Sequence, residues 1–316
     1  MKKAMIILAC LMICGMLSVK AAEQWQIALQ HNGNVTHFDC DQLSKAIAAA
    51  ENGDTIFLSE GTFSSSSTSI TINKAITIIG AGADNTKISP SVYVNIPNSP
   101  TLTARLLDGV SLDHLTISCE VTGLSIRKCK IQTSLSFITN DNKIKEVVID
   151  RCSIGTLYLS SAVGSLVANN SSLDLKYQGY RVPSAVFVNC DVHCYTYANE
   201  KIGAHFLNCR IDWDGISNVN YDENIRFTNC LAKEGFPCFN AKTATNCYTY
   251  SGDLTDTSNE YFVSQGWVGT DGTAVGMYGT TTPYTLTPSG LTVTSYKLGV
   301  DTEKKKLNVK MTLGSH

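Results

Sequence analysis

Charged residues are scarce in this chain of 316 residues and make up only 16% of the sequence. The 25 basic and 27 acidic residues nearly balance, so the chain has no excess of positive charge. Proteins that bind nucleic acid or anionic lipid usually carry clusters of Lys and Arg that neutralise phosphate groups. The composition therefore indicates neither partner and suits a β-rich protein with a neutral polar surface.

Helical patterning is missing from the part of the chain between residues 119 and 247. Apolar residues alternate there with polar ones, and Gly, Asn, Asp and Ser separate the runs. Alternation with a period of two is typical of strands, whereas an amphipathic helix needs a period near 3.6. This absence excludes leucine-rich repeats and helical solenoids.

The same region contains a repeat marked by cysteine. A cysteine ends a short alternating run seven times, and five of these runs align clearly. A sixth run has a serine in the cysteine's place. The aligned positions, called rungs below, are Cys152, Ser171, Cys190, Cys209, Cys230 and Cys247. Successive rungs follow one another in nearly even steps, and a period of about 20 residues indicates a stacked repeat.

A repeat of about 20 residues can form three short strands and three turns, which make one coil of a parallel β-helix. Equivalent residues of successive coils lie about 4.8 Å apart and form columns along the protein. Asn precedes most rungs, at positions 170, 189, 208, 229 and 246, and Asn tolerates the left-handed backbone that such a corner needs. Lys128 and Arg151 interrupt the series, so we expect their turns to be made differently. The cysteine is expected to point inward as a small apolar residue.

Two segments resemble the opening of right-handed parallel β-helix proteins of the pectate-lyase-like superfamily. Leu43 to Phe63 contains Gly53-Asp-Thr-Ile56 and Gly61-Thr-Phe63, and Ile70 to Gly80 follows it. The resemblance covers about residues 40 to 250. It implies a right-handed solenoid of the secreted bacterial type, with a short helix over one end of the coil stack.

The sequence predicts three parts: a signal peptide over 1–21, a β-helix with its amino-terminal cap over 22–250, and a carboxy-terminal cap over 251–316. The capping helix is expected to begin at Asp39, paired with Gln42, and to end at Asn52-Gly53. Leu43, Ile47 and Ala50 would form its apolar face. After about Tyr250 we expect a Gly-rich loop over 266–279 and a β-hairpin of 291–298 and 307–313.

The segment 1–21 reads as a secretory signal, with two lysines at its start, an apolar core and a small-residue cleavage site. The apolar run is short for a membrane span, so no transmembrane segment is expected in the mature chain. We expect the protein to be secreted, periplasmic or on the cell surface. Removal of 1–21 takes away three lysines and no acid, which leaves 22 basic and 27 acidic residues and a net charge of −5.

Ten cysteines remain after removal of the signal. Disulfides are the default in a secreted chain, but neighbours on parallel strands seldom offer the geometry that a disulfide needs. No Cys-x-x-Cys pair occurs, and Cys190 and Cys194 are the nearest approach to a metal pair. Buried thiols are the favoured interpretation, while disulfide and metal remain alternatives.

Enzymes that share the resemblance use recognisable acidic and basic elements. Uronate lyases bind Ca²⁺ through Asp and Glu and use Arg or Lys as a base, and glycosidases use two or three Asp with a Gly-His-Gly element. The chain contains no Gly-His-Gly. The best catalytic candidates are Asp212 and Asp214, which would share one strand face, with Asp222 and Glu223 half a coil later. The alternative is a solvated turn.

Aromatic residues form a second candidate site. Tyr158 and Tyr177 each lie six residues after a rung, Tyr195 and Tyr197 follow Cys190, and Trp213 follows Cys209. In stacked coils these rings would form a ribbon on one outer face, suited to binding the apolar face of a sugar. The alternative is that some rings point inward.

The fold does not name a function. The favoured hypothesis is a secreted or cell-surface protein that binds polysaccharide along an outer face, without a cofactor. The alternatives are a polysaccharide lyase or glycoside hydrolase acting on acidic glycans, with Ca²⁺ if a lyase, and a structural or adhesive solenoid with a protein partner.

Overall fold

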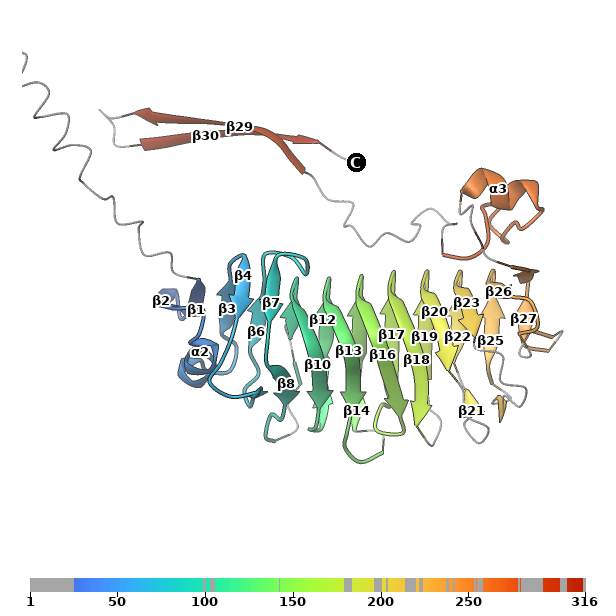
Figure 1. Cartoon of the computed structure of the whole chain (residues 1–316), viewed down its shortest axis with the longest axis horizontal. Coiled ribbons are helices and arrows are strands. Elements are labelled where there is room, and N and C mark those ends of the chain that lie inside the picture. The colour runs from blue at the N-terminus through green and yellow to red at the C-terminus, as the bar shows by residue number, and fades with distance from the viewer. Residues whose placement is uncertain are drawn as a thin grey trace, which may run out of the picture.

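The computed structural model describes residues 26–98, 101–102, 106–141, 143–178, 184–195, 201–202, 204–213, 220–221, 224–236, 239–240, 242–252, 254, 258–277, 279, 292–301 and 306–314. It is an all-β parallel solenoid of about 8 turns with about 20 residues per turn, which confirms the predicted parallel β-helix. The strands stack side by side along one axis, from β1 at one end to β27 at the other (Figure 1). The predicted signal segment lies outside the described residues. Among those residues, no helix has the length and apolar character needed to cross a bilayer.

Two long sheets run the length of the stack. The first, called sheet A here, has the order β2 (Asn34–Phe38), β1 (Ile27–His31), β3 (Thr55–Leu58), β6 (Thr77–Ile79), β9 (Leu107–Asp108), β12 (Ser125–Arg127), β15 (Val147–Asp150), β17 (Ser165–Asn169), β19 (Ser184–Val188), β22 (His205–Leu207), β25 (Arg226–Thr228) and β27 (Ala244–Thr245). From β3 onward its strands pair in parallel.

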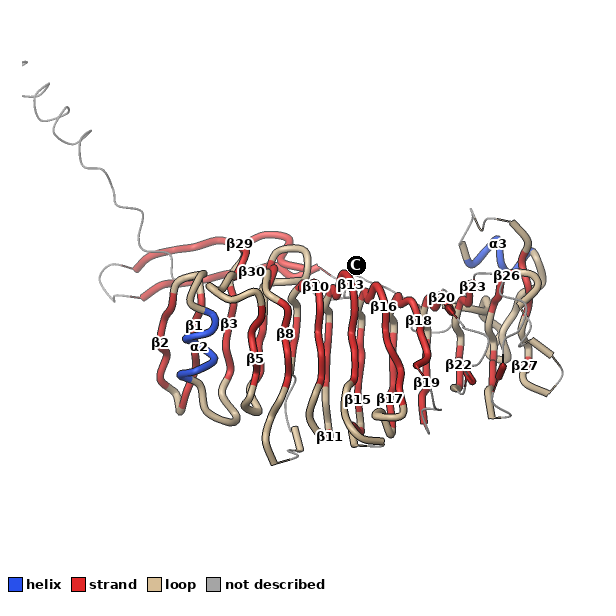
Figure 2. The backbone as a smooth tube through the Cα atoms, turned by 60° about the horizontal axis from the view of Figure 1, so that its bottom comes forward, coloured by secondary structure: helices blue, strands red, loops and turns tan. Residues whose placement is uncertain are grey.

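The second, sheet B, has the order β28 (Tyr248–Tyr250), β26 (Leu231–Lys233), β23 (Arg210–Trp213), β20 (Asp191–Tyr195), β18 (Ser172–Gln178), β16 (Ser153–Ser160), β13 (Lys130–Phe137), β10 (Ser111–Ile117), β7 (Thr86–Ile88) and β4 (Gly61–Phe63). The strands β5 (Ser69–Ile72) and β8 (Ser91–Val94) pair with each other, and β8 also pairs with β10. Short pairs join β11 (Val121–Thr122) to β14 (Ile144–Lys145) and β21 (Lys201–Ile202) to β24 (Asn220–Tyr221). The tube view in Figure 2 shows the successive strands and loops of the coils.

The alternating pattern explains the core. In β19, Ala185 and Phe187 are buried while their neighbours are partly or fully exposed, as a strand with one buried face requires. Phe187, Phe206 and Phe227 occupy one column and stack with 5.0 Å between successive ring centroids. The interior is therefore built from identical positions of consecutive coils.

Each coil turns from sheet A into sheet B through a two-residue corner. The first corner residue has a left-handed backbone at every Asn that the sequence predicts, with φ between 47° and 54°. Lys128 and Arg151 adopt the same conformation, with φ of 50° and 55°. Our expectation that these two turns are made differently is therefore wrong. The flanking sheets fix the corner backbone, and Lys and Arg accept the strain that Asn tolerates better.

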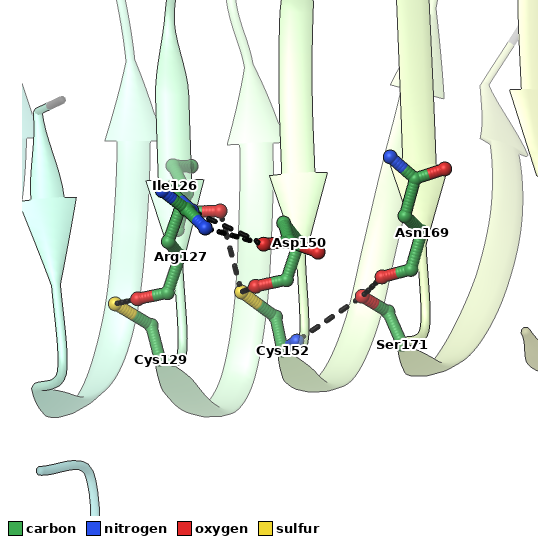
Figure 3. A network of polar contacts seen from close by, with 7 residues as sticks. All are labelled: Ile126, Arg127, Cys129, Asp150, Cys152, Asn169 and Ser171. Atoms are coloured by element: carbon green, nitrogen blue, oxygen red, sulfur yellow. Dashed lines mark hydrogen bonds and ion pairs between the residues drawn. The ribbon is translucent and has the colours of Figure 1, made fainter. Parts of the chain in front are cut away.

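The rung residue is the second residue of the corner. The Cys152 thiol donates to the carbonyl oxygens of Asp150 and Ile126, both at 3.5 Å. Its backbone N–H donates to Ser171 Oγ at 3.1 Å, and that hydroxyl donates to the Asn169 carbonyl at 2.7 Å (Figure 3). The rung side chain therefore accepts from the backbone of the preceding rung and donates to a carbonyl oxygen of its own coil, and the Cys152 thiol also donates to one in the preceding coil.

This hydrogen bonding explains why serine replaces cysteine at one rung. The thiols of Cys209 and Cys230 make the same two kinds of donation at 3.3 to 3.4 Å. The N–H of Cys209 donates to Cys230 Sγ at 3.5 Å, as Cys152 does to serine. The rung is therefore a hydrogen-bonding position as well as the small buried filler that the sequence predicts.

The described cysteines are free thiols. They are Cys40, Cys119, Cys129, Cys152, Cys190, Cys194, Cys209, Cys230 and Cys247, and all but Cys40 and Cys247 are buried. Burial raises the pKa of the Cys152 and Cys209 thiols well above the ordinary value. This shift favours the protonated form of these two thiols, which donates to backbone carbonyl oxygens.

The amino-terminal helix α2 (Leu43–Ala49) lies at the first end of the stack (Figure 1). Leu43, Ile47 and Ala50 are buried, as the apolar pattern predicts, and Ala46 is buried as well. Its N-cap is Gln42 and not Asp39, although Gln42 Oε1 accepts from the Asp39 N–H at 3.4 Å. Lys74 Nζ donates to three carbonyl oxygens at the last turn of the helix, which complements the negative end of its dipole.

An antiparallel hairpin of β1 and β2 precedes the helix. Asn32 and Gly33 form its turn with φ of 47° and 80°, as a type I′ turn requires. At the end of β1, His31 Nδ1 lies 2.9 and 3.0 Å from the two carboxylate oxygens of buried Asp54. This hydrogen bond raises the pKa of the His31 imidazole above its ordinary 6.5.

The raised pKa of His31 predicts a pH-dependent contribution to stability. Because the folded-state pKa is the higher one, the stabilisation is fully present below pH 6.5 and is lost as the pH rises through the folded-state pKa. We expect Asp54→Asn to lower the His31 pKa toward its ordinary value in an NMR titration. His31→Gln should remove this part of the pH dependence of unfolding. An unchanged His31 titration in Asp54→Asn would contradict the pairing.

The carboxy-terminal part contains an unpredicted helix, α3 (Asn259–Ser264), capped by Ser258 Oγ accepting from the Tyr261 N–H. Phe262 and Val275 pack with Leu231 and Tyr250 of the last coils. The predicted Gly-rich loop runs along the last corners, where Asn246 Nδ2 donates to the Val268 carbonyl at 2.8 Å. The predicted hairpin is present as β29 (Thr292–Asp301) and β30 (Lys306–Gly314), paired antiparallel.

Candidate functional site

One outer face of sheet B gathers polar and charged positions over four consecutive coils. It lies on β16, β18, β20 and β23, where the intervening residues Leu173, Leu175, Val192, Cys194 and Ile211 are buried. Strand alternation then turns the other positions outward. We call these positions the polar face: Tyr158, Ser172, Asp174, Lys176, Asp191, His193, Arg210 and Asp212.

An ion pair fixes one edge of the polar face. Arg210 Nε lies 2.7 Å from Asp191 Oδ1, and Arg210 Nη2 lies 2.6 Å from Asp191 Oδ2. The two residues are paired in register on adjacent coils, and both side chains are about three-quarters buried. This bidentate geometry holds the guanidinium plane in one orientation.

A central column places Asp174, His193 and Asp212 on three successive coils. All three are partly buried on the outward side. Asp212 Oδ1 accepts from the N–H of Trp213 at 2.9 Å. A column of carboxylate, imidazole and carboxylate contains groups that can transfer protons or bind hydroxyl groups.

The structure brings Asp212 together with residues that we did not predict. Asp174 and His193 lie three residues after Ser171 and Cys190, the same offset that separates Asp212 from Cys209. This shared offset was the signal that could have found them. The other acidic candidates, Asp214, Asp222 and Glu223, lie outside the described residues.

The aromatic candidates do not share one column. Tyr158 is paired with Lys176, whose Nζ lies 5.7 Å from the centre of the Tyr158 ring, and Lys176 is paired with Tyr195. Tyr177 is instead paired with buried Leu159. Tyr197 lies outside the described residues.

A β-bulge explains why equal offsets give different columns. The register between β16 and β18 shifts by one residue between Ile154 and Leu157. Gly155 lies at this bulge, where an added Cβ would collide with the Gln132 carbonyl oxygen. Tyr158 therefore reaches the outward column, while Tyr177 at the same offset falls one position away.

Trp213 belongs to an inward column. It is paired with buried Cys194, which is paired with buried Leu175. Its ring is partly buried against the core and meets Phe236 edge-on, with 6.1 Å between ring centroids. Trp213 thus packs beneath the polar face rather than beside Tyr158.

The described residues offer no metal centre: no three His, Cys, Asp or Glu side chains among them are placed to hold an ion. The polar face presents the Arg210 guanidinium held by Asp191, the Lys176 ammonium group beside the Tyr158 ring, and the column of Asp174, His193 and Asp212.

No protein-family model and no curated protein matches the chain.

Proposed function

We propose that this protein is secreted or surface-bound and binds an acidic polysaccharide along the polar face. The observation that carries the proposal is the Tyr158 ring with Lys176 Nζ 5.7 Å from its centre, on the same outer face as the Asp191–Arg210 pair. The secretory pattern of residues 1–21 supports the compartment, and the solenoid with its Gly53–Phe63 motif supports membership of the right-handed, pectate-lyase-like class.

The chemistry of the face suits a polymer of charged sugars. A tyrosine ring binds the apolar C–H face of a pyranose, and the Lys176 ammonium group beside Tyr158 can bind a sugar carboxylate. Coils repeat at about 4.8 Å, so a repeating ligand meets equivalent positions on successive coils. The partner chemistry is therefore an extended, negatively charged glycan.

The proposal predicts that the face can be weakened without unfolding the protein. We expect Tyr158→Ala combined with Lys176→Gln to weaken binding of polygalacturonate or alginate by about tenfold or more, a loss of about 1.4 kcal/mol or more. Isothermal titration calorimetry measures this, with circular dichroism as a check of folding. The matched control is Tyr93→Ala, which removes an exposed ring from β8.

The outcomes separate the hypotheses. Equal binding by the double variant and the parent would place the glycan site elsewhere on the molecule. Binding of neutral glucans as tight as that of uronate polymers would remove the role of charge. Failure to bind any glycan on an array would favour an adhesive solenoid with a protein partner.

A hydrolase is the second candidate, favoured by the Asp174–His193–Asp212 column. The two carboxylates lie two coils apart, about 9.6 Å by coil spacing, near the upper end of the separation that inverting glycosidases use. If the protein cleaves a glycan, Asp174→Asn or Asp212→Asn would abolish the formation of cleavage products, while glycan binding persists. Assays for reducing ends and for unsaturated products, with and without added Ca²⁺, distinguish hydrolase from lyase.

A further inference from the structure

A hollow of about 570 Å³ lies beside the first corners of the stack, and its lining residue Ser153 is paired in register with Ser172 at the edge of the polar face. One wall is the loop of residues 80–85, which follows β6, and the other is formed by the corners that follow β9, β12 and β15. Its volume lies in the range of small-molecule sites, about 300 to 1,000 Å³. The hollow is therefore large enough for a ligand of sugar size.

Three cationic residues line this hollow: Lys128, Lys130 and Arg151. Lys128 and Arg151 occupy the same corner position on adjacent coils, about 4.8 Å apart along the stack. Lys130 begins β13, two residues after Lys128. Three positively charged side chains therefore lie on one wall of the hollow.

These cations are not used by the fold. Within the described part of the chain, none of the three side chains forms an ion pair or a hydrogen bond. Arg151 Nε is buried and has no hydrogen-bond partner there. A buried, unpaired donor costs free energy unless a ligand or solvent satisfies it.

The nearby carboxylates do not neutralise the group. Asp150 is paired with Arg127, with Oδ2 at 3.1 Å from Nε and 3.0 Å from Nη2. Asp108 lines the hollow but is buried and has another polar partner. Asp84 also lines it, on the opposite loop. The hollow is therefore lined by three cations and two carboxylates, Asp84 and Asp108, and Asp108 has another partner.

The backbone supplies an independent argument. The other equivalent corners use Gly109, which also lines the hollow, and five asparagines elsewhere in the stack, the residues that adopt left-handed backbone at least cost. At two adjacent corners beside the hollow the chain instead places Lys128 and Arg151, with φ of 50° and 55°. Backbone strain that is retained at two adjacent corners indicates that the Lys128 and Arg151 side chains have a function there.

We propose that this hollow is a binding site for an oxyanion, the carboxylate or sulfate group of an acidic sugar. A guanidinium binds such a group through two parallel N–H donors, and flanking ammonium groups add charge. The loop of residues 80–85 would contact the uncharged part of the ligand. The inference rests on the hollow alone and stands whether or not the polar face binds a polymer.

The corner asparagines supply a test that separates binding from folding. Lys128→Asn and Arg151→Asn introduce the residue that the other corners use, so we expect unchanged or higher thermal stability. Each variant should weaken binding by about tenfold, as expected for loss of a charge-assisted hydrogen bond. Calorimetric titration with galacturonate, a sulfated disaccharide and sodium sulfate measures this. Lys242→Asn, an exposed lysine far along the stack, is the matched control.

Each outcome decides the proposal. Selective loss of sugar binding in Lys128→Asn and Arg151→Asn, with Lys242→Asn unaffected, supports it. Sulfate binding as tight as that of the sulfated disaccharide also supports it and identifies the free ion as sufficient. The proposal is wrong if the parent protein binds none of the probes at millimolar concentration, or if all variants bind them equally.

Discussion

Replacing Phe206 with alanine is expected to lower the free energy of unfolding by about 3–5 kcal/mol. Its ring is 1% exposed and stacks between Phe187 and Phe227, with 5.0 Å to each ring centroid. The substitution leaves a cavity and removes two aromatic contacts, each worth about 0.5–1.5 kcal/mol. Urea unfolding followed by circular dichroism measures the loss.

Two further variants test this interpretation of Phe206. Phe206→Leu keeps most of the buried volume and should cost clearly less than Phe206→Ala. Phe57→Ala removes a ring that is 41% exposed on β3, and we expect a change below about 1 kcal/mol. If Phe206→Ala were no more costly than Phe57→Ala, the ring stack would not support the solenoid.

The second large effect is expected at a rung. Cys230→Ala removes the acceptor for the Cys209 N–H at 3.5 Å and should destabilise the protein by about 1–3 kcal/mol. Cys230→Ser should cost less, because Ser171 already makes the equivalent hydrogen bonds at another rung. Denaturant unfolding under reducing conditions compares the two.

A control for the rung prediction is Cys40→Ala, which changes a partly buried cysteine outside the corner column and should have a small effect. Equal losses for Cys230→Ala and Cys230→Ser would mean that the thiol serves only as an apolar filler. A loss in Cys230→Ala alone would establish the hydrogen bond as the reason for a sulfur or oxygen at this position.

The repeat could be predicted because a solenoid imposes one spacing on every coil. The rungs from Cys152 to Cys247 recur at the length of one coil, and the structure places them at the same corner. The error at Lys128 and Arg151 has a physical origin. A sequence preference reports which residue adopts a conformation most easily, whereas the neighbouring strands decide which conformation is adopted.

The site was harder to predict than the fold. Asp212 lies on the polar face, but the side-by-side placement of Asp174 and His193 depends on cross-coil register. The bulge at Gly155 shifts the register between β16 and β18, so counting from the rungs misaligned Tyr158 and Tyr177. Strand alternation also places Trp213 on the inward side, opposite Asp212, and our prediction of an outward ring overlooked this.

The sequence at the two ends of the stack contains local signals for a turn and a helix that our predictions did not use. The Asn32-Gly33 pair is a strong hairpin signal between two alternating runs, and the structure turns there. Ser258 precedes α3 and caps it through its hydroxyl. Both features are local, whereas the repeat that identifies the fold is long-range.

The hairpin at the first end also governs how copies of this molecule meet. A parallel coil stack with an open edge can be extended by another stack in the same direction, which leads to end-to-end polymers. Here β1 runs antiparallel to β3, and the outermost strand β2 exposes Asn34, Thr36 and His37. A second stack therefore meets a hairpin whose five-residue edge strand exposes mostly polar side chains, and such a short polar edge disfavours fibre growth from this end.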